Sequence, residues 1–129
     1  MAGCNVLIAD DNARARFGLR VLLNLRPEIE VVGEATDGQE ALDMVQDRRP
    51  DVVLMDARMP MLDGLEATRR VKARWPEIRI VLTSMVVSHR AEALAAGADA
   101  FLLKGNPTEE LLAAILGREM EETKWPAPS

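Results

Sequence analysis

Cysteine is almost absent from this 129-residue chain, and long apolar runs are absent altogether. The single thiol, Cys4, cannot form a disulfide within the chain, which favours a reducing compartment, and it is expected to be a small buried residue at the start of a strand. No apolar run approaches the roughly 18 residues of a membrane span. The first residues also lack a basic segment followed by a long apolar stretch, so no signal peptide is expected. These absences predict a cytoplasmic protein with no membrane partner.

Positive charge is also in short supply, because 16 Lys and Arg residues stand against 21 Asp and Glu residues and the formal net charge is -5. Proteins whose main partner is a nucleic acid usually carry a basic surface, so direct nucleic-acid binding by this chain is not expected. Hydrophobic residues make up 48% of the sequence, which suffices for one core, and the length suits one domain. We expect one domain over residues 1–122 and a short tail over residues 123–129, whose Trp125 either packs as a cap or belongs to a disordered end.

Short aliphatic runs alternate with helical patterns along the chain. The runs predict buried strands at residues 5–9, 30–35, 52–55, 79–83 and 100–103. The patterns between them predict helices at residues 13–25, 38–48, 64–75, 89–96 and 107–122. Strict alternation indicates an α/β fold, with a parallel five-stranded sheet and helices on both faces. The run at 30–35 is the most polar of the five and is therefore expected at a sheet edge.

Three of the predicted helices begin with an N-cap residue that is followed three positions later by glutamate. The side chain of such a cap accepts a hydrogen bond from a backbone N–H that has no partner inside the helix. The pairs are Asp37 with Glu40, Asp63 with Glu66, and Asn106 with Glu109.

Polar side chains stand at the ends of four of the predicted strands. They are Asp10 and Asp11 after the first strand, Asp56 after the third, Thr83 at the end of the fourth and Lys104 after the fifth. In a parallel sheet these positions share the carboxyl edge, where the functional groups of open α/β folds gather beside a topological switch point. Three carboxylates, a hydroxyl and an ammonium together predict a phosphoryl-transfer site built around a hard divalent cation.

Charge balance indicates what such a site requires. Carboxylates about 4–5 Å apart repel one another by several kcal/mol at an effective dielectric constant of about 20. Mg²⁺ is a natural compensator, since it binds through one or two carboxylates together with phosphate and water. Lys104 supplies another positive charge and can hold a phosphoryl oxygen, to which Thr83 can donate a hydrogen bond. One aspartate is expected to act as the nucleophile and form an acyl phosphate.

Four segments carry a resemblance to a known family, and they read VLIADDN, DVVLMDARMPMLDG, IVLTS and GADAFLLKG. With them the chain resembles the receiver domain of bacterial two-component response regulators over about residues 4–116. The segments GADAFLLK and GNPTEELLAAI resemble its NarL/FixJ-type branch. The resemblance implies a CheY-like, flavodoxin-like (βα)₅ sandwich of three layers with strand order 2-1-3-4-5.

The resemblance also implies a metal-binding phosphoacceptor. Asp56 stands in the family's phosphoacceptor position, ahead of the Met-Pro and Asp-Gly pairs of the same loop. By this resemblance Asp11 and Asp56 bind Mg²⁺, with the backbone carbonyl of Arg58 as a third protein ligand. Asp10 assists through a water molecule. The side chain of Arg58 either tunes water access to the acyl phosphate or is a solvated loop charge.

Other positions match the family's phosphoryl-sensing switch, with two departures. The resemblance places Thr83 and Lys104 against the phosphoryl oxygens and Phe101 at the aromatic switch position. Gly105 follows the lysine where many receivers have proline, and the stretch from Thr83 to Gly97 is about one residue shorter than usual. His89 in that stretch is expected to be an exposed residue at a helix start, with a pH-sensing or phosphorelay role as the alternative.

The implied function is that of a phospho-accepting signalling switch in a two-component phosphorelay. Asp56 would take its phosphoryl group, with Mg²⁺, from a phosphohistidine of a sensor histidine kinase or phosphotransfer protein. The chain would not be an enzyme with a separate substrate, because it would catalyse only its own phosphorylation and dephosphorylation. The alternative is the receiver portion of a NarL/FixJ-type DNA-binding transcriptional regulator without its helix-turn-helix domain. Whether the chain forms a homodimer is left open.

Two other functions of similar α/β proteins fit less well. A metal-dependent phosphatase usually needs an acid/base aspartate two residues after the nucleophile, where this chain has Arg58. A flavin-binding protein needs a cradle of Gly, Ser and Thr after the first strand, where this chain has the acidic segment 10–14.

Overall fold

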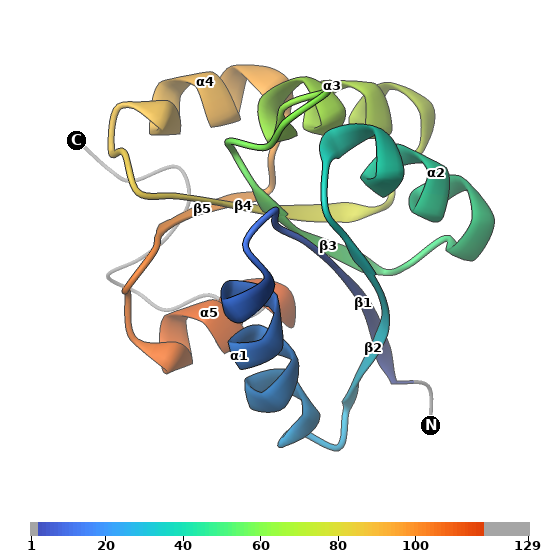
Figure 1. Ribbon diagram of the computed structural model, residues 1–129, viewed down its shortest axis with the longest axis vertical. Helices are drawn as coiled ribbons and strands as arrows, with labels where there is room; N and C mark the ends of the chain where they lie inside the picture. The colour runs from blue at the N-terminus through green and yellow to red at the C-terminus, as the bar shows by residue number, and fades with distance from the viewer. Residues whose placement is uncertain (1–2, 118–129) are drawn as a thin grey trace.

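Strands and helices alternate through the computed structural model, which describes residues 3–117 (Figure 1). The strands are β1 (Cys4–Ala9), β2 (Ile29–Ala35), β3 (Val52–Asp56), β4 (Arg79–Ser84) and β5 (Ala100–Leu103). The helices are α1 (Ala13–Asn24), α2 (Gly38–Arg48), α3 (Gly64–Arg74), α4 (His89–Ala96) and α5 (Thr108–Ile115). All ten predicted elements are confirmed. Within residues 3–117, no helix combines the length and apolar character needed to cross a bilayer.

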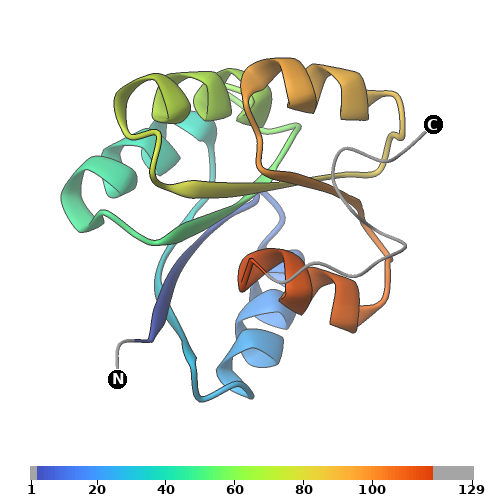
Figure 2. The same ribbon diagram turned by 180° about the vertical axis from the view of Figure 1, so that it is seen from behind.

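The sheet has strand order β2-β1-β3-β4-β5, and all its neighbouring strands are parallel. β2 therefore lies at an edge, as its polar sequence predicts. Helices α1 and α5 cover one face of the sheet, and α2, α3 and α4 cover the other (Figures 1 and 2). The predicted three-layer, flavodoxin-like architecture is confirmed.

The core consists of two clusters, one on each face of the sheet. Side chains alternate between the faces along a strand, so Val53 of β3 packs with the α2–α4 layer and Leu54 packs with the α1/α5 layer. Both residues are at most 2% exposed. Because the central strands are buried on both faces, they read as continuous aliphatic runs rather than as alternating patterns.

Two of the three predicted helix caps are confirmed. The carboxylate of Asp37 accepts a hydrogen bond from the backbone N–H of Glu40 at 2.8 Å, and Asp63 accepts one from Glu66 at 2.8 Å. Both caps hold the starts of helices on the α2–α4 side of the sheet.

The prediction for the fifth helix is wrong at its start and differs at its end. Pro107 occupies the N-cap position with extended ψ, so the helix begins one residue later than predicted and Asn106 lies outside capping range. The side-chain amide of Asn106 instead donates to Glu110 at 2.9 Å. The helix ends at Ile115, and Gly117 follows with a φ of 73°, a conformation that terminates helices. The predicted helical extension to 122, the tail 123–129 and Trp125 lie outside the described residues.

Candidate functional site

The predicted site residues converge because they continue the strands with the same side-chain alternation. Asp10 follows Ile8 at a spacing of two, and Asp56 likewise follows Leu54. The side chains of Ile8 and Leu54 both belong to the core cluster under α1 and α5. Thr83 and Lys104 continue β4 and β5 with that same alternation. The carboxyl edge of the sheet therefore directs the polar groups toward the α1/α5 side.

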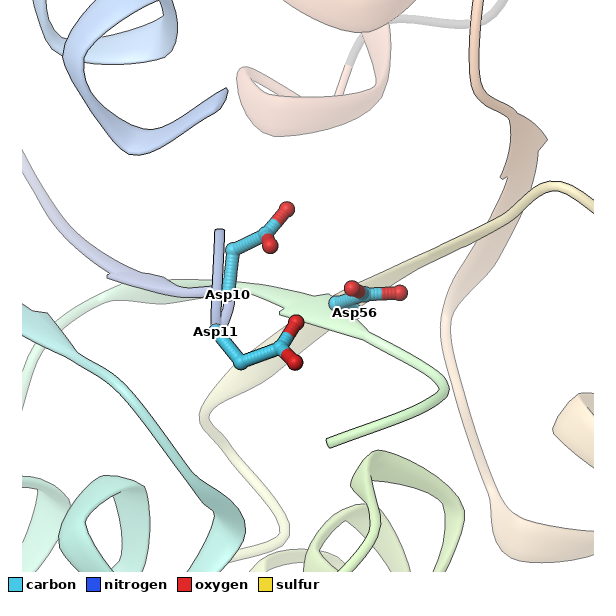
Figure 3. Close-up of side chains that lie close together, drawn as sticks. All are labelled: Asp10, Asp11 and Asp56. Atoms are coloured by element: carbon cyan, nitrogen blue, oxygen red, sulfur yellow. The ribbon is translucent and has the colours of Figure 1, made fainter. Parts of the chain in front are cut away.

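Three carboxylates form the centre of the site. Asp10 and Asp11 extend from the end of β1 and Asp56 from the end of β3, and they gather at one edge of the sheet (Figure 3). One oxygen from each lies within 4.8 Å of the others, with Asp10 and Asp56 buried and Asp11 exposed. Two oxygen ligands of one Mg²⁺ lie roughly 3–4 Å apart, because each is about 2.1 Å from the ion. The donor set and its spread therefore suit a hard divalent cation with some ligands supplied by water.

Lys104 joins the two buried carboxylates across the sheet. Its Nζ donates to Oδ2 of Asp10 at 2.9 Å and to Oδ2 of Asp56 at 3.1 Å. Burial acts to lower the pKa of Lys104, but the hydrogen bonds to Asp10 and Asp56 and the negative charges of both carboxylates together outweigh it, so this pKa is raised above its ordinary value. The ammonium stays charged at neutral pH and remains available to a phosphoryl oxygen.

Asp56 is held in a different electrostatic state from a surface carboxylate. It is 7% exposed, and this burial raises its pKa. The hydrogen bond and charge of Lys104 lower the pKa, while the charge of Asp10 raises it, and the net direction is upward. A carboxylate that is poorly solvated and held by one ammonium is a suitable nucleophile, because little water must be removed before it reacts.

The hydroxyl of Thr83 completes the cluster at one side. It lies 3.5 Å from the backbone carbonyl of Met55, at the limit of a hydrogen bond, so it can turn to another acceptor. A cavity of about 260 Å³ opens beside Asp10, Thr83 and Lys104, and apolar residues of α1 and α5 form its far walls. The polar groups thus face open space that a small anionic group could enter.

Sequence reasoning missed two residues that fix the loop between β1 and α1. Asn12 caps α1 by accepting from the N–H of Ala15 at 2.9 Å, and its own N–H donates to Oδ1 of Asp10 at 2.9 Å. Arg16 donates from its guanidinium to the backbone carbonyl of Asp10 at 2.7 Å and pairs with Glu34 of β2 at 3.3 Å. The cap could have been found from the Asn before a helical pattern, whereas the role of Arg16 depends on β2.

Three other positions that the sequence singled out, Arg58, Phe101 and Gly105, lie near the site but outside the carboxylate cluster. The backbone N–H of Arg58 is 3.4 Å from Oδ1 of Asp56, and the side chain of Arg58 is exposed. Phe101 is buried on the opposite face of the sheet from Lys104, with the guanidinium of Arg90 5.6 Å from its ring centre. Gly105 has a φ of 95°, which proline cannot adopt, so the turn after the lysine differs from a proline turn.

The prediction that His89 is exposed is wrong. His89 is 7% exposed, and its Nδ1 lies 2.7 Å from Oγ of Ser84. The pattern of α4 gave no sign of this, because the hydrogen-bond partner of the ring lies at the end of β4 and meets it only in the folded chain.

A family model described as "Response regulator receiver domain" matches residues 6–116. The transcriptional regulatory protein YhcZ of Bacillus subtilis, described as uncharacterized, is 44% identical over 109 residues, which are 83% of this chain and 51% of YhcZ. The transcriptional regulatory protein DesR of Bacillus subtilis is 41% identical over 111 residues, which are 86% of this chain and 56% of DesR. The chain spans about half the length of the curated relatives it matches.

Solved structures give the same result. The signal receiver domain of the putative response regulator NarL from Mycobacterium tuberculosis superposes with a TM-score of 0.83 and 33% identity, covering 92% of this chain and 100% of that domain. The response regulator domain of Thermotoga maritima CheB superposes with a TM-score of 0.82 and 32% identity, covering 89% of this chain and 95% of that domain.

Proposed function

This chain belongs to the response regulator receiver domain family, and from that premise we propose that Asp56 is the residue that accepts the phosphoryl group. The observation that carries the proposal is the bridge of Lys104 between Asp10 and Asp56, at 2.9 and 3.1 Å. Each of the two bridged carboxylates also accepts one backbone N–H, but the bond from Asn12 to Asp10 is 2.9 Å long and the one from Arg58 to Asp56 is 3.4 Å, so Asp56 is the less firmly held nucleophile. Its sequence context, with Met59-Pro60 and Asp63-Gly64 downstream, matches the phosphoacceptor loop.

The reaction needs few chemical groups from the protein. An oxygen of Asp56 attacks the phosphorus of a phosphohistidine, and the phosphorus–nitrogen bond breaks with its electron pair going to the imidazole. The Nζ of Lys104 already lies at Asp56 and Asp10, so it can donate to a phosphoryl oxygen as the acyl phosphate forms. Hydrolysis of that acyl phosphate by water resets the switch, and no separate substrate is consumed.

Mg²⁺ is the proposed cofactor, and the carboxylate cluster supports it through its donor type and spread. Asp11 and Asp56 would hold the ion directly, the backbone carbonyl of Arg58 would be a third protein ligand, and Asp10 would act through water. When bound, the ion would neutralise charge on the phosphoryl oxygens.

The partners that fit this chemistry are a sensor histidine kinase or a phosphotransfer protein. The relatives at 41% and 44% identity are described as transcriptional regulatory proteins, and the match to this chain covers 56% and 51% of their lengths. A second form of the proposal is therefore that this chain is the receiver portion of a regulator whose output domain binds DNA.

Incubation of the purified protein with acetyl phosphate and Mg²⁺, followed by intact mass measurement, tests the proposal. A gain of one phosphoryl mass that is lost on treatment with hydroxylamine supports an acyl phosphate. No gain under conditions in which a known receiver domain is phosphorylated would contradict the proposed function.

Replacement of Asp11 by alanine tests the metal site. Without metal, Asp11→Ala should be more stable than wild type, because it removes repulsion among carboxylates that lie within 4.8 Å. With Mg²⁺ at ten times its Kd, wild type should gain about 1.4 kcal/mol of stability, and Asp11→Ala should gain far less. Thermal unfolding with and without Mg²⁺ measures both effects.

The matched control is Asp47→Ala, which removes an exposed carboxylate from α2, away from the acidic cluster. It should keep the full response to Mg²⁺. An Asp11→Ala protein that responds to Mg²⁺ as strongly as this control would rule out Asp11 as a ligand.

Thr83 and Phe101 are the proposed switch pair. In this structure the Thr83 hydroxyl makes only a 3.5 Å contact to Met55, so a phosphoryl oxygen should draw it away at little cost. Beryllofluoride can replace the phosphoryl group in an NMR titration. Amide shifts should spread from Asp56 to residues 86–104 in wild type and stay near Asp10, Asp56 and Lys104 in Thr83→Ala. Identical shift patterns in the two proteins would show that Thr83 does not relay the signal.

A further inference from the structure

The only histidine of the chain lies in the interior, on the other face of the sheet from the carboxylate cluster. His89 is the first residue of α4, and its Nδ1 is 2.7 Å from Oγ of Ser84, the last residue of β4. Ser84 is 1% exposed. A buried imidazole paired with a buried hydroxyl is a specific contact that the phosphoryl chemistry described above does not use.

The other hydrogen bond of the Ser84 hydroxyl indicates which group donates in this contact. Oγ of Ser84 accepts the backbone N–H of Val86 at 2.9 Å, which leaves its single hydrogen for donation to Nδ1 of His89. The ring proton then lies on Nε2, which faces the carboxylate of Glu92 at 3.9 Å. With the proton on Nδ1 instead, the lone pair of Nε2 would face that carboxylate and the serine hydrogen would lose this acceptor. His89 is therefore the acceptor in the pair.

Ser84 connects this pair to the phosphoryl-transfer site. It directly follows Thr83, and because side chains alternate along β4, Thr83 faces the site while Ser84 faces α4. The backbone carbonyl of Ser84 accepts the N–H of Lys104 at 2.8 Å. Ser84, which is hydrogen-bonded to His89, is thus covalently joined to Thr83 and hydrogen-bonded to the backbone of Lys104. Thr83 and Lys104 are the two proposed phosphoryl contacts.

The loop between β4 and α4 contributes little to holding these two ends together. Ser88 stands at the N-cap of α4 but makes no side-chain capping bond. Met85 and Val87 of the connecting loop are 76% and 61% exposed. The backbone N–H of His89 does bond to the carbonyl of Val86 at 3.1 Å, within the loop itself. The Ser84–His89 bond is therefore a direct side-chain link between the strand end and the helix start.

Resting on the proposed function, we propose that His89 is a positioning residue for phosphoryl transfer: its hydrogen bond to Ser84 fixes the end of β4 and so places the Thr83 hydroxyl and the Lys104 backbone. Loss of the acceptor lets the strand end shift. A displacement on the order of 1 Å in a site of this kind reduces rates by ten- to a hundredfold.

Two substitutions of His89 separate the hydrogen bond from packing. His89→Asn keeps an acceptor near the position of Nδ1 but loses ring volume, whereas His89→Leu keeps more volume and loses the acceptor. The rate of phosphoryl mass gain with acetyl phosphate and Mg²⁺ should fall about tenfold in His89→Leu and stay within about twofold of wild type in His89→Asn. Melting temperatures should not follow this order, because His89→Asn leaves the larger cavity. Leu94→Ala, an exposed change on the same helix, should leave the rate unchanged.

Rates that follow the melting temperatures of the two variants, or a His89→Leu rate equal to wild type, would overturn the assignment. Ser84→Ala removes the donor of the same hydrogen bond, and it replaces His89→Leu in the test if that variant does not fold. The phosphorylation rate of Ser84→Ala should also be about tenfold lower than that of wild type. The double variant Ser84→Ala/His89→Leu should be no slower than either single variant. A wild-type protein that gains no phosphoryl mass contradicts the proposed function itself, whereas unchanged rates in the variants contradict only the role of His89.

Discussion

Replacement of Asp56 by asparagine is expected to abolish phosphorylation and, at the same time, to stabilise the metal-free protein. Asparagine has nearly the shape of aspartate but its amide is not a nucleophile, so the mass gain seen with acetyl phosphate and Mg²⁺ should vanish. Asp10 is not expected to replace it, because its hydrogen bonds from Lys104 and from the backbone N–H of Asn12, both 2.9 Å long, are shorter than the corresponding bonds of Asp56 at 3.1 and 3.4 Å. A phosphoryl gain that persists in Asp56→Asn would place the acceptor elsewhere.

The expected gain in stability follows from the raised pKa of Asp56. Burial is the main cause of that rise, and together with the charge of Asp10 it outweighs the opposing effects of Lys104 and of the Arg58 N–H. The folded state therefore binds the proton more tightly than the unfolded state, and the free energy of unfolding falls as the pH rises from the ordinary carboxyl range through the raised pKa. Above that range the full cost of the buried charge is present.

Asp56→Asn removes this cost and should raise the free energy of unfolding at neutral pH by roughly 1 kcal/mol. The advantage should shrink as the pH falls through the raised pKa of Asp56, because the protonated native carboxyl resembles the amide. Denaturant unfolding of both proteins across this pH range, without Mg²⁺, measures the difference. A variant that is less stable than wild type at neutral pH would show that the ion pair with Lys104 outweighs the burial of Asp56.

Replacement of Gly64 by alanine should strongly destabilise the protein. A Cβ built at this position lies 1.9 Å from the backbone carbonyl oxygen of Asp56 and 3.0 Å from Cγ of Met55. The backbone of Asp56 is held in the sheet, where it pairs with Thr83 of β4, so it cannot move away without disturbing the phosphoacceptor. We expect a loss of about 3 kcal/mol or more, together with slower phosphorylation of the protein that remains folded.

Gly18→Ala is the matched control, since it makes the same chemical change within helix α1 where nothing lies within 4 Å of the new Cβ. It should stabilise the protein by about 0.5–1 kcal/mol, because alanine loses less backbone entropy than glycine in a helix. Thermal or denaturant unfolding of the two variants should therefore change in opposite directions. A Gly64→Ala protein as stable as wild type would mean that the close approach at Gly64 is relieved by a small shift of α3.

Local features of the sequence were sufficient for the architecture and for most of the site. Aliphatic runs, helical periodicity and the caps at Asp37 and Asp63 depend on residues within a few positions of one another, so they can be read before the chain folds. The polar residues at the strand ends could be placed together because parallel strands share one carboxyl edge. The alternation of strands and helices and the acidic cluster at Asp10, Asp11 and Asp56 follow from these local rules, whereas the strand order was predicted from the family resemblance.

The remaining features depend on residues far apart in the chain, and the tertiary structure alone decided them. The bridge from Lys104 to Asp10 spans 94 positions, and the contact of Arg16 with Glu34 requires β2 to pair beside β1. His89 has a polar helix-start context, yet it is buried because the end of β4 lies against α4. Asn106 has the sequence of a cap, but the fixed backbone of Pro107 moves the helix start past it. Sequence periodicity specifies which face of an element is apolar, whereas burial and pairing of a given side chain are set by the element that packs onto it.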